Sequence, residues 1–438
     1  MNEIVALTHC LAPYVSRTAL QQMRQVVLAV LCLSGRVTML GVSRWTEQGG
    51  SYRTIQRWMQ TPVDWGQVLW TVVRVHLLDS DGVYLLAGDE VVVSKAGKST
   101  HGLGRFYSSM AQRVIPGLSF LALSLVDVEQ RRAYPLGLRQ RVPVQTAATA
   151  TPALKRGRGR PKGSKNHAKA APTLSPELTL LAALLRAVLS LIAPLAVKHL
   201  VLDGFFGTYP ATWMVRDCGL HLISKLRHNA ALYLPYAGPK PRRGPTPRCG
   251  DQLDYKRLPD EARVSAVSEG NLLTETYQLT SLHKDFSDPL NVVVLVKTDL
   301  KTGKRAHVVL FSTDLSLSAA QIVDYYSLRF QIEFNFRDAK QYWGLEDFMN
   351  VSEQAVTNAA NLAFLMVNLS TVLLQPHRQH EPAFSVLDLK CHFRARRYLL
   401  ETINSLPDPP AAHLISRLWQ RFSALGSIRP PSQFQDAA

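Results

Sequence analysis

Residues 326–340 read YSLRFQIEFNFRDAK and carry four functional side chains in the spacing Y-x2-R-x3-E-x6-K. The four are Tyr326, Arg329, Glu333 and Lys340. On a helix, with about 100° between residues, they fall at roughly 0°, 300°, 340° and 320°, within one arc of about 60°. A carboxylate beside a guanidinium, an ammonium and a phenol can hold a divalent cation and a polyanion on one surface. The alternative is an amphipathic helix whose solvated face collects polar residues.

Two further carboxylates follow apolar runs that predict buried strands. Residues 83–87 lead to Asp89, and residues 199–202 lead to Asp203. In α/β sheets, the side chains at the carboxyl ends of strands usually form the site. If Asp89, Asp203 and Glu333 converge, they could hold two Mg²⁺ ions about 3.5 to 4 Å apart for phosphodiester chemistry. For either Asp alone, a turn residue or a helix N-cap is an equally good interpretation.

The charge of the chain indicates a polyanionic partner. Its 438 residues are 46% hydrophobic and carry a formal net charge of +17. This length allows two or three domains with a large core. Residues 131–176 hold eleven Lys and Arg and no Asp or Glu, and a second acid-free basic run precedes Asp251. Basic runs of this kind favour nucleic acid over an acidic membrane surface.

The five cysteines are widely spaced and never form a C-x-x-C pair. This argues against a disulfide framework and a thiolate zinc site, and it fits a reducing compartment. The beginning of the chain shows no secretory signal pattern. The most apolar segment, residues 178–200, is interrupted by Arg186, Pro194 and Lys198, so we interpret it as a buried helix. The sequence therefore favours a cytoplasmic protein without a membrane partner.

Residues 1–78 are predicted to form a helical DNA-binding domain. Within it, residues 36–60 read as a helix, a Gly-Gly turn and a second helix with Ser51 as its N-cap. Arg53 and Arg57 on the second helix are the candidate base or backbone contacts of a recognition helix in a major groove. An ordinary helical hairpin is equally compatible with this pattern.

Residues 79–345 change to short β-branched and apolar runs, which predict an α/β domain. The runs at 199–202 and 221–225 flank a predicted helix at 210–218, as in a β-α-β unit. A β-rich insertion is predicted at about 228–318. Residues 346–438 are predicted to be helical, and their apolar stripe at 355–374 is either internal core or part of a dimerisation surface.

A basic linker is predicted at residues 150–172. Its Arg158-Gly159-Arg160-Pro161 resembles the core of an AT-hook, whose extended backbone enters a narrow minor groove. The alternative is a flexible linker with only nonspecific affinity, and both interpretations place Arg158 and Arg160 on DNA. Lys95 and Lys98, which follow Asp89, either line the DNA path or belong to a solvated loop.

Asp89, Asp203 and Glu333, with the Y-R-E-K spacing around the Glu, resemble the insertion-sequence DDE transposases over roughly residues 83–345. The resemblance implies an α/β fold with an RNase H-like mixed sheet flanked by helices, a β-rich insertion, and helical N- and C-terminal regions. One departure is Glu90, because the first Asp of this group is often followed by Thr or Asp. We favour Asp89 as the ligand because neighbouring side chains on a strand face opposite sides of the sheet.

The resemblance also implies a role for each of the matching residues. The three acids would be the catalytic metal ligands and would bind two Mg²⁺ ions, for which Mn²⁺ substitutes. Tyr326 and Arg329 would contact the DNA backbone at the transposon end, and Lys340 would hold a phosphate beside the cleavage point.

The expected function is a DNA transposase that cleaves the terminal inverted repeats of a transposon and joins them to target DNA. Such an enzyme would act on double-stranded DNA in the bacterial cytoplasm, associated with the nucleoid. A homodimer on DNA is expected, because two ends must be held together and one chain shows one acid triad. The alternatives are an RNase H-like DNA nuclease and a noncatalytic DNA-binding protein derived from a transposase.

Overall fold

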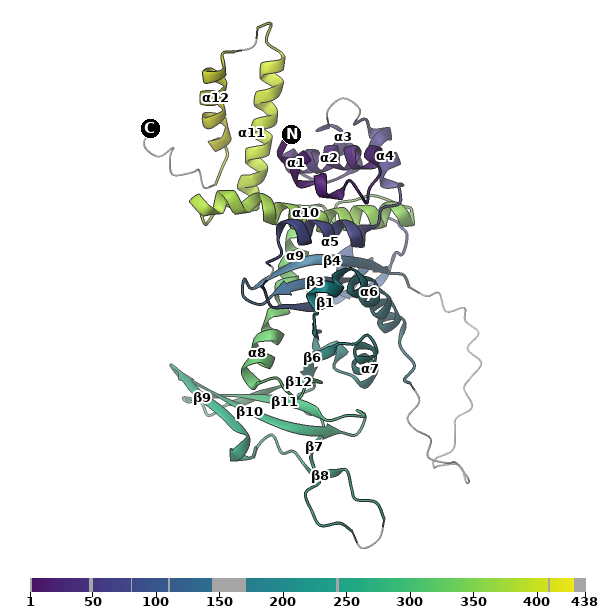
Figure 1. Ribbon diagram of the computed structural model, residues 1–438, viewed down its shortest axis with the longest axis vertical. Helices are drawn as coiled ribbons and strands as arrows, with labels where there is room; N and C mark the ends of the chain where they lie inside the picture. Colours follow the sequence, from purple (N-terminus) through teal and green to yellow (C-terminus); the bar gives the residue numbers. More distant parts are fainter. Residues whose placement is uncertain are drawn as a thin grey trace, which may run out of the picture.

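The computed structural model describes residues 2–46, 50–79, 81–108, 111–143, 171–241, 244–408 and 410–428 (Figure 1). The helices in this part of the chain are α1 (Asn2–Leu7), α2 (Arg17–Cys32), α3 (Met39–Ser43), α4 (Tyr52–Met59), α5 (Trp65–His76), α6 (Pro176–Ile192), α7 (Tyr209–Asp217), α8 (Ala319–Leu328), α9 (Gln331–Gln341), α10 (Glu353–His380), α11 (Val386–Asn404) and α12 (Ala412–Ala424). The strands are β1 (Tyr84–Ser94), β2 (Gly104–Ser108), β3 (Arg113–Asp127), β4 (Arg132–Arg141), β5 (His199–Val201), β6 (His221–Leu226), β7 (Leu232–Pro235), β8 (Cys249–Gln252), β9 (Arg263–Glu269), β10 (Leu272–His283), β11 (Leu290–Asp299) and β12 (Arg305–Ser312).

Five strands form the centre of a mixed sheet, in the order β4-β3-β1-β5-β6. β1, β3 and β4 are antiparallel neighbours, whereas β5 runs parallel to β1 and β6 parallel to β5. The connection from β5 to β6 runs through α7, as the predicted β-α-β unit requires. This arrangement confirms the predicted RNase H-like α/β fold.

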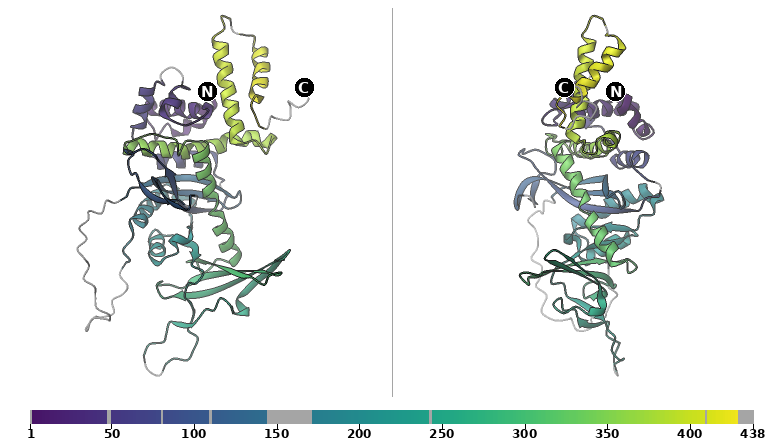
Figure 2. Two further views of the ribbon diagram at one scale, coloured as in Figure 1. Left: turned by 180° about the vertical axis from the view of Figure 1, so that it is seen from behind. Right: turned by 90° about the vertical axis from the view of Figure 1, so that its left-hand side faces the viewer.

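The sheet continues beyond β6 into the β-rich region that the sequence predicts as an insertion. β12 pairs antiparallel with β6 and is followed by β11 and β10. β10 then pairs with β9 near its beginning and with β7 near its end. β9 and the adjoining part of β10 project from the body of the molecule as an arm, which is clearest in the left view of Figure 2.

Helices cover both faces of the central sheet, and successive side chains along each strand point to one face and then the other. Leu85 and Ala87 of β1 share a core with Ile322 and Leu328 of α8. Leu86, between them in sequence, belongs to the core that α6 and α7 close from the opposite side. The direction of each side chain on β1 therefore decides whether it meets α8 or the α6–α7 layer.

The N- and C-terminal helices pack together at one end of this sheet. Helices α2, α4 and α5 share one core with α9, α10 and α11, and the division into domains remains a prediction. Asn358 of α10 lies at the centre of this contact. It accepts a hydrogen bond from the Trp65 indole at 2.8 Å and donates to the Met59 and Thr61 carbonyl oxygens, each also at 2.8 Å.

Helices α6 and α10 are long and apolar enough to cross a membrane by length and composition alone. Both are packed within the fold described here. The apolar window of α10 is 83% buried, as expected for a core helix, whereas that of α6 is 39% buried, and α6 packs against β4 and β3 with one side. The predicted helix is therefore present and ends at Ile192, just before Pro194, but only part of its surface is buried.

Two local predictions were wrong. The strand predicted at residues 83–87 does not end at Asp89, because β1 pairs with β3 without interruption from Tyr84 to Ser94. Residues 326–340 do not lie on one regular helix, because α8 ends at Leu328 and α9 begins at Gln331. Between them the amides of Arg329, Phe330, Ile332 and Glu333 donate to carbonyl oxygens three residues earlier, which is the tighter pattern of a 3₁₀ helix.

Candidate active site

Asp89 lies on β1, and Asp203 follows the end of β5, the parallel neighbour of β1. The parallel register pairs Leu86 with Leu200 and Ala87 with Val201, so Asp89 and Asp203 each stand two residues beyond the last pair. β5 ends at Val201, whereas β1 continues past Asp89 along β3. Asp89 is thus placed at the carboxyl end of its parallel neighbour rather than at the end of its own strand.

The face of the sheet to which each acid belongs follows from the alternation along the strand. Ala87 and Val201 belong to the core under α8, and Asp89 and Asp203 follow them by two residues on the same face. Glu90 lies on the other face, where it accepts hydrogen bonds from the Ser119 hydroxyl and, at 3.1 Å, from Arg141. Asp89 therefore faces α8 and α9, whereas Glu90 faces the opposite side of the sheet.

Arg329 joins Asp89 to Glu333. Its Nη1 lies 2.5 Å from Oδ2 of Asp89, and its Nη2 lies 3.2 Å from Oε1 of Glu333. The Asp89 and Arg329 side chains are 18% and 16% exposed, so this ion pair is screened little by solvent. Burial raises the pKa of Asp89 to about 6, although the Arg329 charge and the hydrogen bond from the Glu90 amide lower it.

Asp203 combines a structural and an electrostatic role. Its Oδ1 accepts a hydrogen bond from the Phe205 amide at 3.1 Å and so caps the turn Gly204–Phe206. Burial raises its pKa, and the positive charge of Arg329 acts against that shift. The N-cap interpretation of Asp203 is therefore correct. Asp89, Asp203 and Glu333 all act on the same guanidinium.

Tyr326 lies one helical turn before Arg329 and is half-buried. Burial raises the pKa of its phenol, and the adjacent Arg329 charge lowers it. Asp203 and Asp89 are close enough to raise it further. Tyr326 and Arg329 therefore lie close to Asp89 and Asp203, and Arg329 also contacts Glu333.

Lys340 and Lys95 are held away from this group. The Lys340 ammonium donates to the Val92 carbonyl oxygen at 2.8 Å and pairs with Glu346 at 3.2 Å. The Lys95 ammonium donates to the carbonyl oxygens of Glu346 and Phe348, both at 2.9 Å, and burial lowers its pKa to about 8. Both lysines thus fix the loop after α9 to β1, and Lys98 is exposed.

Of the other predicted DNA contacts, Arg53 and Arg57 are exposed on α4. Ser51 caps this helix as expected, and its opposite face buries Ile55 and Trp58. Gly49 of the predicted Gly49-Gly50 turn lies outside the described part of the chain, as do Arg158 and Arg160.

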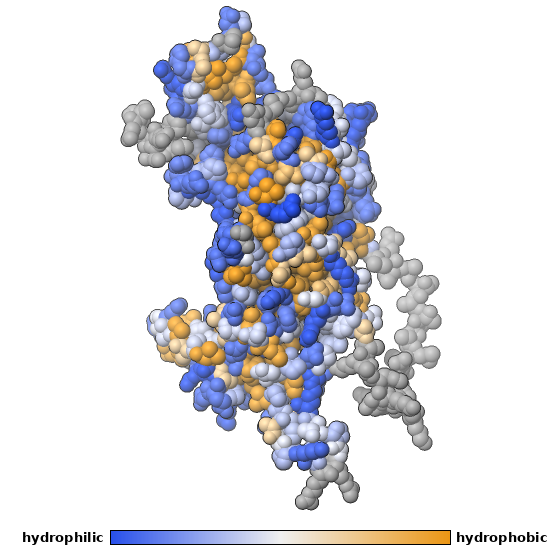
Figure 3. Space-filling model, viewed as in Figure 1, coloured by the Kyte–Doolittle hydropathy of each residue, from blue (hydrophilic) through white to orange (hydrophobic). Residues whose placement is uncertain are grey.

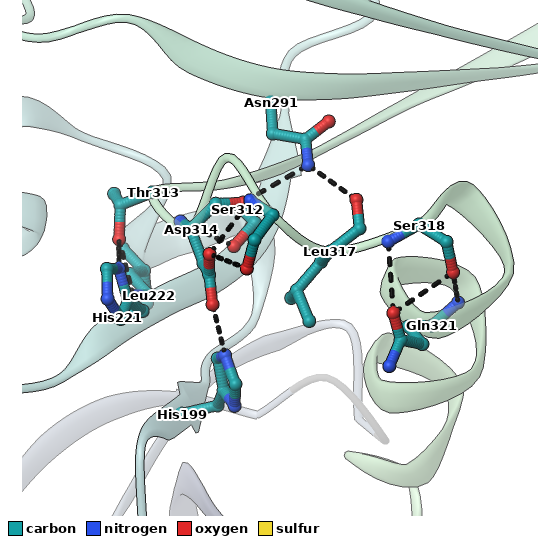
Figure 4. A network of polar contacts seen from close by, with 11 residues as sticks. His199, His221, Leu222, Asn291, Ser312, Thr313, Asp314, Leu317, Ser318 and Gln321 are labelled. Atoms are coloured by element: carbon teal, nitrogen blue, oxygen red, sulfur yellow. Dashed lines mark hydrogen bonds and ion pairs between the residues drawn. The ribbon is translucent and has the colours of Figure 1, made fainter.

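A polar network that the sequence analysis missed fixes the beginning of α8 (Figure 4). Asp314 accepts from Nε2 of His199 at 2.9 Å, and His199 is the first residue of β5. Asn291 of β11 donates to the Leu317 carbonyl oxygen at 2.8 Å. Ser318 and Gln321 then form a capping box at the first turn of α8. The network ties the strand that leads to Asp203 to the helix that leads to Arg329.

The donor atoms of the three acids suit a hard divalent cation, because carboxylate oxygens are the ligands that Mg²⁺ prefers. Within the described ranges, however, no three His, Cys, Asp or Glu side chains are arranged to hold a metal ion. Arg329 lies between two of the acids. Its Nε is buried and has no hydrogen-bond partner among the residues described, so the guanidinium retains capacity for one more acceptor.

Comparison with protein families identifies the group to which this arrangement belongs. The family model described as DDE superfamily endonuclease matches residues 10–285, which include Asp89 and Asp203. The chain belongs to the DDE superfamily endonucleases. Endonucleases of this superfamily are generally dependent on divalent metal ions and act on DNA. The match ends before Glu333, so the third acid and the Y-R-E-K signature rest on the geometry alone, and none of the curated proteins matches the chain.

Proposed function

We propose that this DDE endonuclease is a DNA transposase that cleaves transposon ends and joins them to target DNA. The observation that carries the proposal is the meeting of Asp89, Asp203 and Glu333 around Arg329. The three acids come from β1, the end of β5 and α9, and they are 114 and 130 residues apart in sequence. Burial raises the pKa of Asp89 and of Asp203, and buried acids with raised pKa values beside a cationic side chain are typical of functional sites.

In this proposal the acids hold two Mg²⁺ ions, with Mn²⁺ as a substitute. When bound, such ions activate a water or a 3′-hydroxyl and stabilise the leaving oxygen of a phosphodiester. The protein side chains supply the remaining functions. Arg329 binds a backbone phosphate through its planar fork, and Tyr326 contacts the adjacent backbone. Lys340 reaches a phosphate only after it releases Glu346.

The DNA path extends beyond the acids. A net charge of +17 supplies long-range attraction to double-stranded DNA. Arg53 and Arg57 present a basic surface on α4, and Arg158 and Arg160 contribute further charge from the linker. These contacts would bind the terminal inverted repeats and bring the scissile phosphate to Asp89.

Assembly on DNA is proposed to involve two copies of the chain. The protruding helices α11 and α12 leave apolar side chains exposed, including Tyr398, Leu400 and Leu414 at 53%, 40% and 40%. Figure 3 shows this apolar surface on the hairpin, away from the sheet. A pairing of these hairpins would bring two acid centres into one complex, and sizing the protein with end DNA tests it.

The rival proposal is a nuclease that cleaves without joining. Both enzymes need the acid centre, but joining also requires the cut 3′ end to be kept beside a second duplex. The β-rich insertion and the helical flanks favour joining, because a simple nuclease does not require such extensions. A noncatalytic protein derived from a transposase would instead bind end DNA without cutting it.

The test is a joining assay with a labelled, pre-cleaved transposon end and a circular target in Mg²⁺. We expect the wild-type protein to produce a target carrying the label. Asp203→Ala should bind the end in a gel-shift measurement but produce no joined target. Cleavage of an intact end without any joined product would support the nuclease instead, and binding without either product would support the noncatalytic protein.

A further inference from the structure

Arg329 occupies the position at which the proposed metal ions need free carboxylate oxygens. Its Nη1 engages Oδ2 of Asp89, and the other oxygen of Asp89, Oδ1, accepts a hydrogen bond from the Glu90 amide at 2.8 Å. Its Nη2 engages Glu333. Both oxygens of Asp89 therefore have a partner within the protein. The positive charge of Arg329 therefore already occupies the Asp89 carboxylate that a metal ion would need.

A metal ion and this guanidinium cannot share Asp89 without cost. Mg²⁺ needs carboxylate oxygens at about 2.0 to 2.1 Å and accepts little distortion of its coordination geometry. Arg329 already approaches the Asp89 oxygen to 2.5 Å. Two cations bound to the same carboxylate repel each other strongly in a site with little solvent. The ion can bind fully only if Arg329 moves.

Two features favour a movement of Arg329 toward a phosphate. Its Nε is buried without a partner among the described residues, so the present position does not satisfy the side chain completely. It also lies in the turn between α8 and α9, whose amides donate to carbonyl oxygens three residues earlier, and a tightened turn of this kind between helical segments often marks a hinge. A phosphate offers Arg two oxygens in the geometry that its fork prefers.

We propose that Arg329 is a positioning residue that couples DNA binding to metal binding. Without DNA, it holds Asp89 and Glu333 together and keeps divalent ions out. A backbone phosphate of the transposon end draws the guanidinium away and frees the carboxylate oxygens. This inference rests on the proposed function. It adds that the metal centre is assembled by the substrate and is not present beforehand.

The experiment measures Mn²⁺ binding by the full-length protein with electron paramagnetic resonance, with and without a pre-cleaved end duplex. Mn²⁺ that associates with the duplex itself is subtracted by a parallel titration of Asp203→Asn with the same DNA. Coupling between two sites commonly changes affinity by 5- to 150-fold, so DNA should tighten Mn²⁺ binding to the wild-type protein by about tenfold or more. By linkage, Mn²⁺ should tighten DNA binding by the same factor.

Arg329→Gln removes the positive charge that contacts Asp89 and Glu333. This variant should bind Mn²⁺ without DNA about tenfold or more tightly than the wild-type protein, and DNA should then add little. Arg141→Gln is the matched control, because Arg141 also bridges two carboxylates, Glu90 and Glu177, but on the other face of the sheet. The control should bind Mn²⁺ as the wild-type protein does.

Equal or weaker Mn²⁺ binding by DNA-free Arg329→Gln would overturn the inference. If this variant does not fold, Arg329→Lys provides the same test, because one ammonium cannot bridge both acids as the fork does. It should bind Mn²⁺ more tightly than the wild-type protein, and equal binding would count against the coupling. A third outcome would refute the proposed function as well. In that case the wild-type protein and the Arg329 variants would all bind, in the presence of DNA, no more Mn²⁺ than Asp203→Asn does, and the acids would not form a metal site.

Discussion

Replacing Asp89 with Asn should make the metal-free protein more stable at pH 8. Burial raises the pKa of Asp89 from its ordinary 3.8 to about 6. The unfolded chain therefore releases this proton more readily than the folded protein does. Its contribution to folding is most favourable below about pH 4 and is lost as the pH rises through about 6. A difference of about two pKa units corresponds to about 3 kcal/mol at pH 8.

Asn resembles the protonated carboxyl group, so Asp89→Asn should gain up to about 3 kcal/mol at pH 8 and about half as much at pH 5. Glu333 and Asp203 remain near Arg329 in this variant. Urea denaturation in EDTA at both pH values measures the free energy of unfolding. EDTA is needed because a bound divalent ion would stabilise the wild-type acids.

Glu90→Gln is the control at the neighbouring position. Its carboxylate pairs with Arg141 and accepts from Ser119, so this substitution should leave stability unchanged or lower it. A wild-type protein that is more stable than Asp89→Asn at pH 8 would refute the reasoning. So would a difference between the two proteins that does not change between pH 5 and pH 8.

Three further predictions concern the packing and the DNA-binding surfaces. Asn358→Leu should lower the free energy of unfolding by about 3 kcal/mol or more, because Asn358 is buried and its four partners, Gln354 among them, lose their hydrogen bonds; urea denaturation measures it, and a loss below about 1 kcal/mol would contradict the structure. Replacing Arg53 and Arg57 together with Ala should reduce the slope of log affinity against log salt by about two units, whereas an unchanged slope would place α4 away from DNA. The double substitution of Arg158 and Arg160 should reduce it by about one to two units, and no change would exclude the linker from the DNA path.

The strands that lead to Asp89 and Asp203 could be predicted because each contains an unbroken apolar run. The runs that lead to Asp89 and Asp203 are buried on both faces, and their order along the chain fits β1 and β5. β4 was missed because Arg132, Arg139 and Arg141 belong to the acid-free basic run at residues 131–176, which hides the apolar pattern between them. These side chains lie toward the ends of the strand, and the apolar middle, such as Leu136, is buried.

The signature placed Arg329 beside Glu333 correctly, but it also placed Lys340 with them, and Lys340 is engaged elsewhere. Helical periodicity placed Arg329, Glu333 and Lys340 on one arc, and the structure does join Arg329 to Glu333. The tighter turn at Arg329 depends on local hydrogen bonds that periodicity does not contain. Lys340 is engaged by Val92 and Glu346, and the first of these is 248 residues away in sequence.

Long-range polar contacts were beyond sequence reasoning for the same reason. His199 and Asp314 are separated by 115 residues, and neither belongs to a recognisable motif. Their pairing depends on β5 and β12 lying on either side of β6 in the folded sheet. The closure of the acid centre by Arg329 likewise became visible only when β1 and the α8–α9 turn were placed together.

The central claim is that Asp89, Asp203 and Glu333 form one catalytic acid centre and that Glu90 is not part of it. Its most direct test is the cleavage of labelled transposon-end DNA in Mg²⁺ and in Mn²⁺ by four single Ala variants, with a gel-shift measurement beside each. We expect no cleavage by Asp89→Ala, Asp203→Ala or Glu333→Ala and retained DNA binding in all three, because each ion depends on shared ligands. Glu90→Ala should still cleave. Cleavage by Asp203→Ala or Glu333→Ala would contradict the account, and cleavage by Asp89→Ala but not by Glu90→Ala would move the first ligand to the other face of β1.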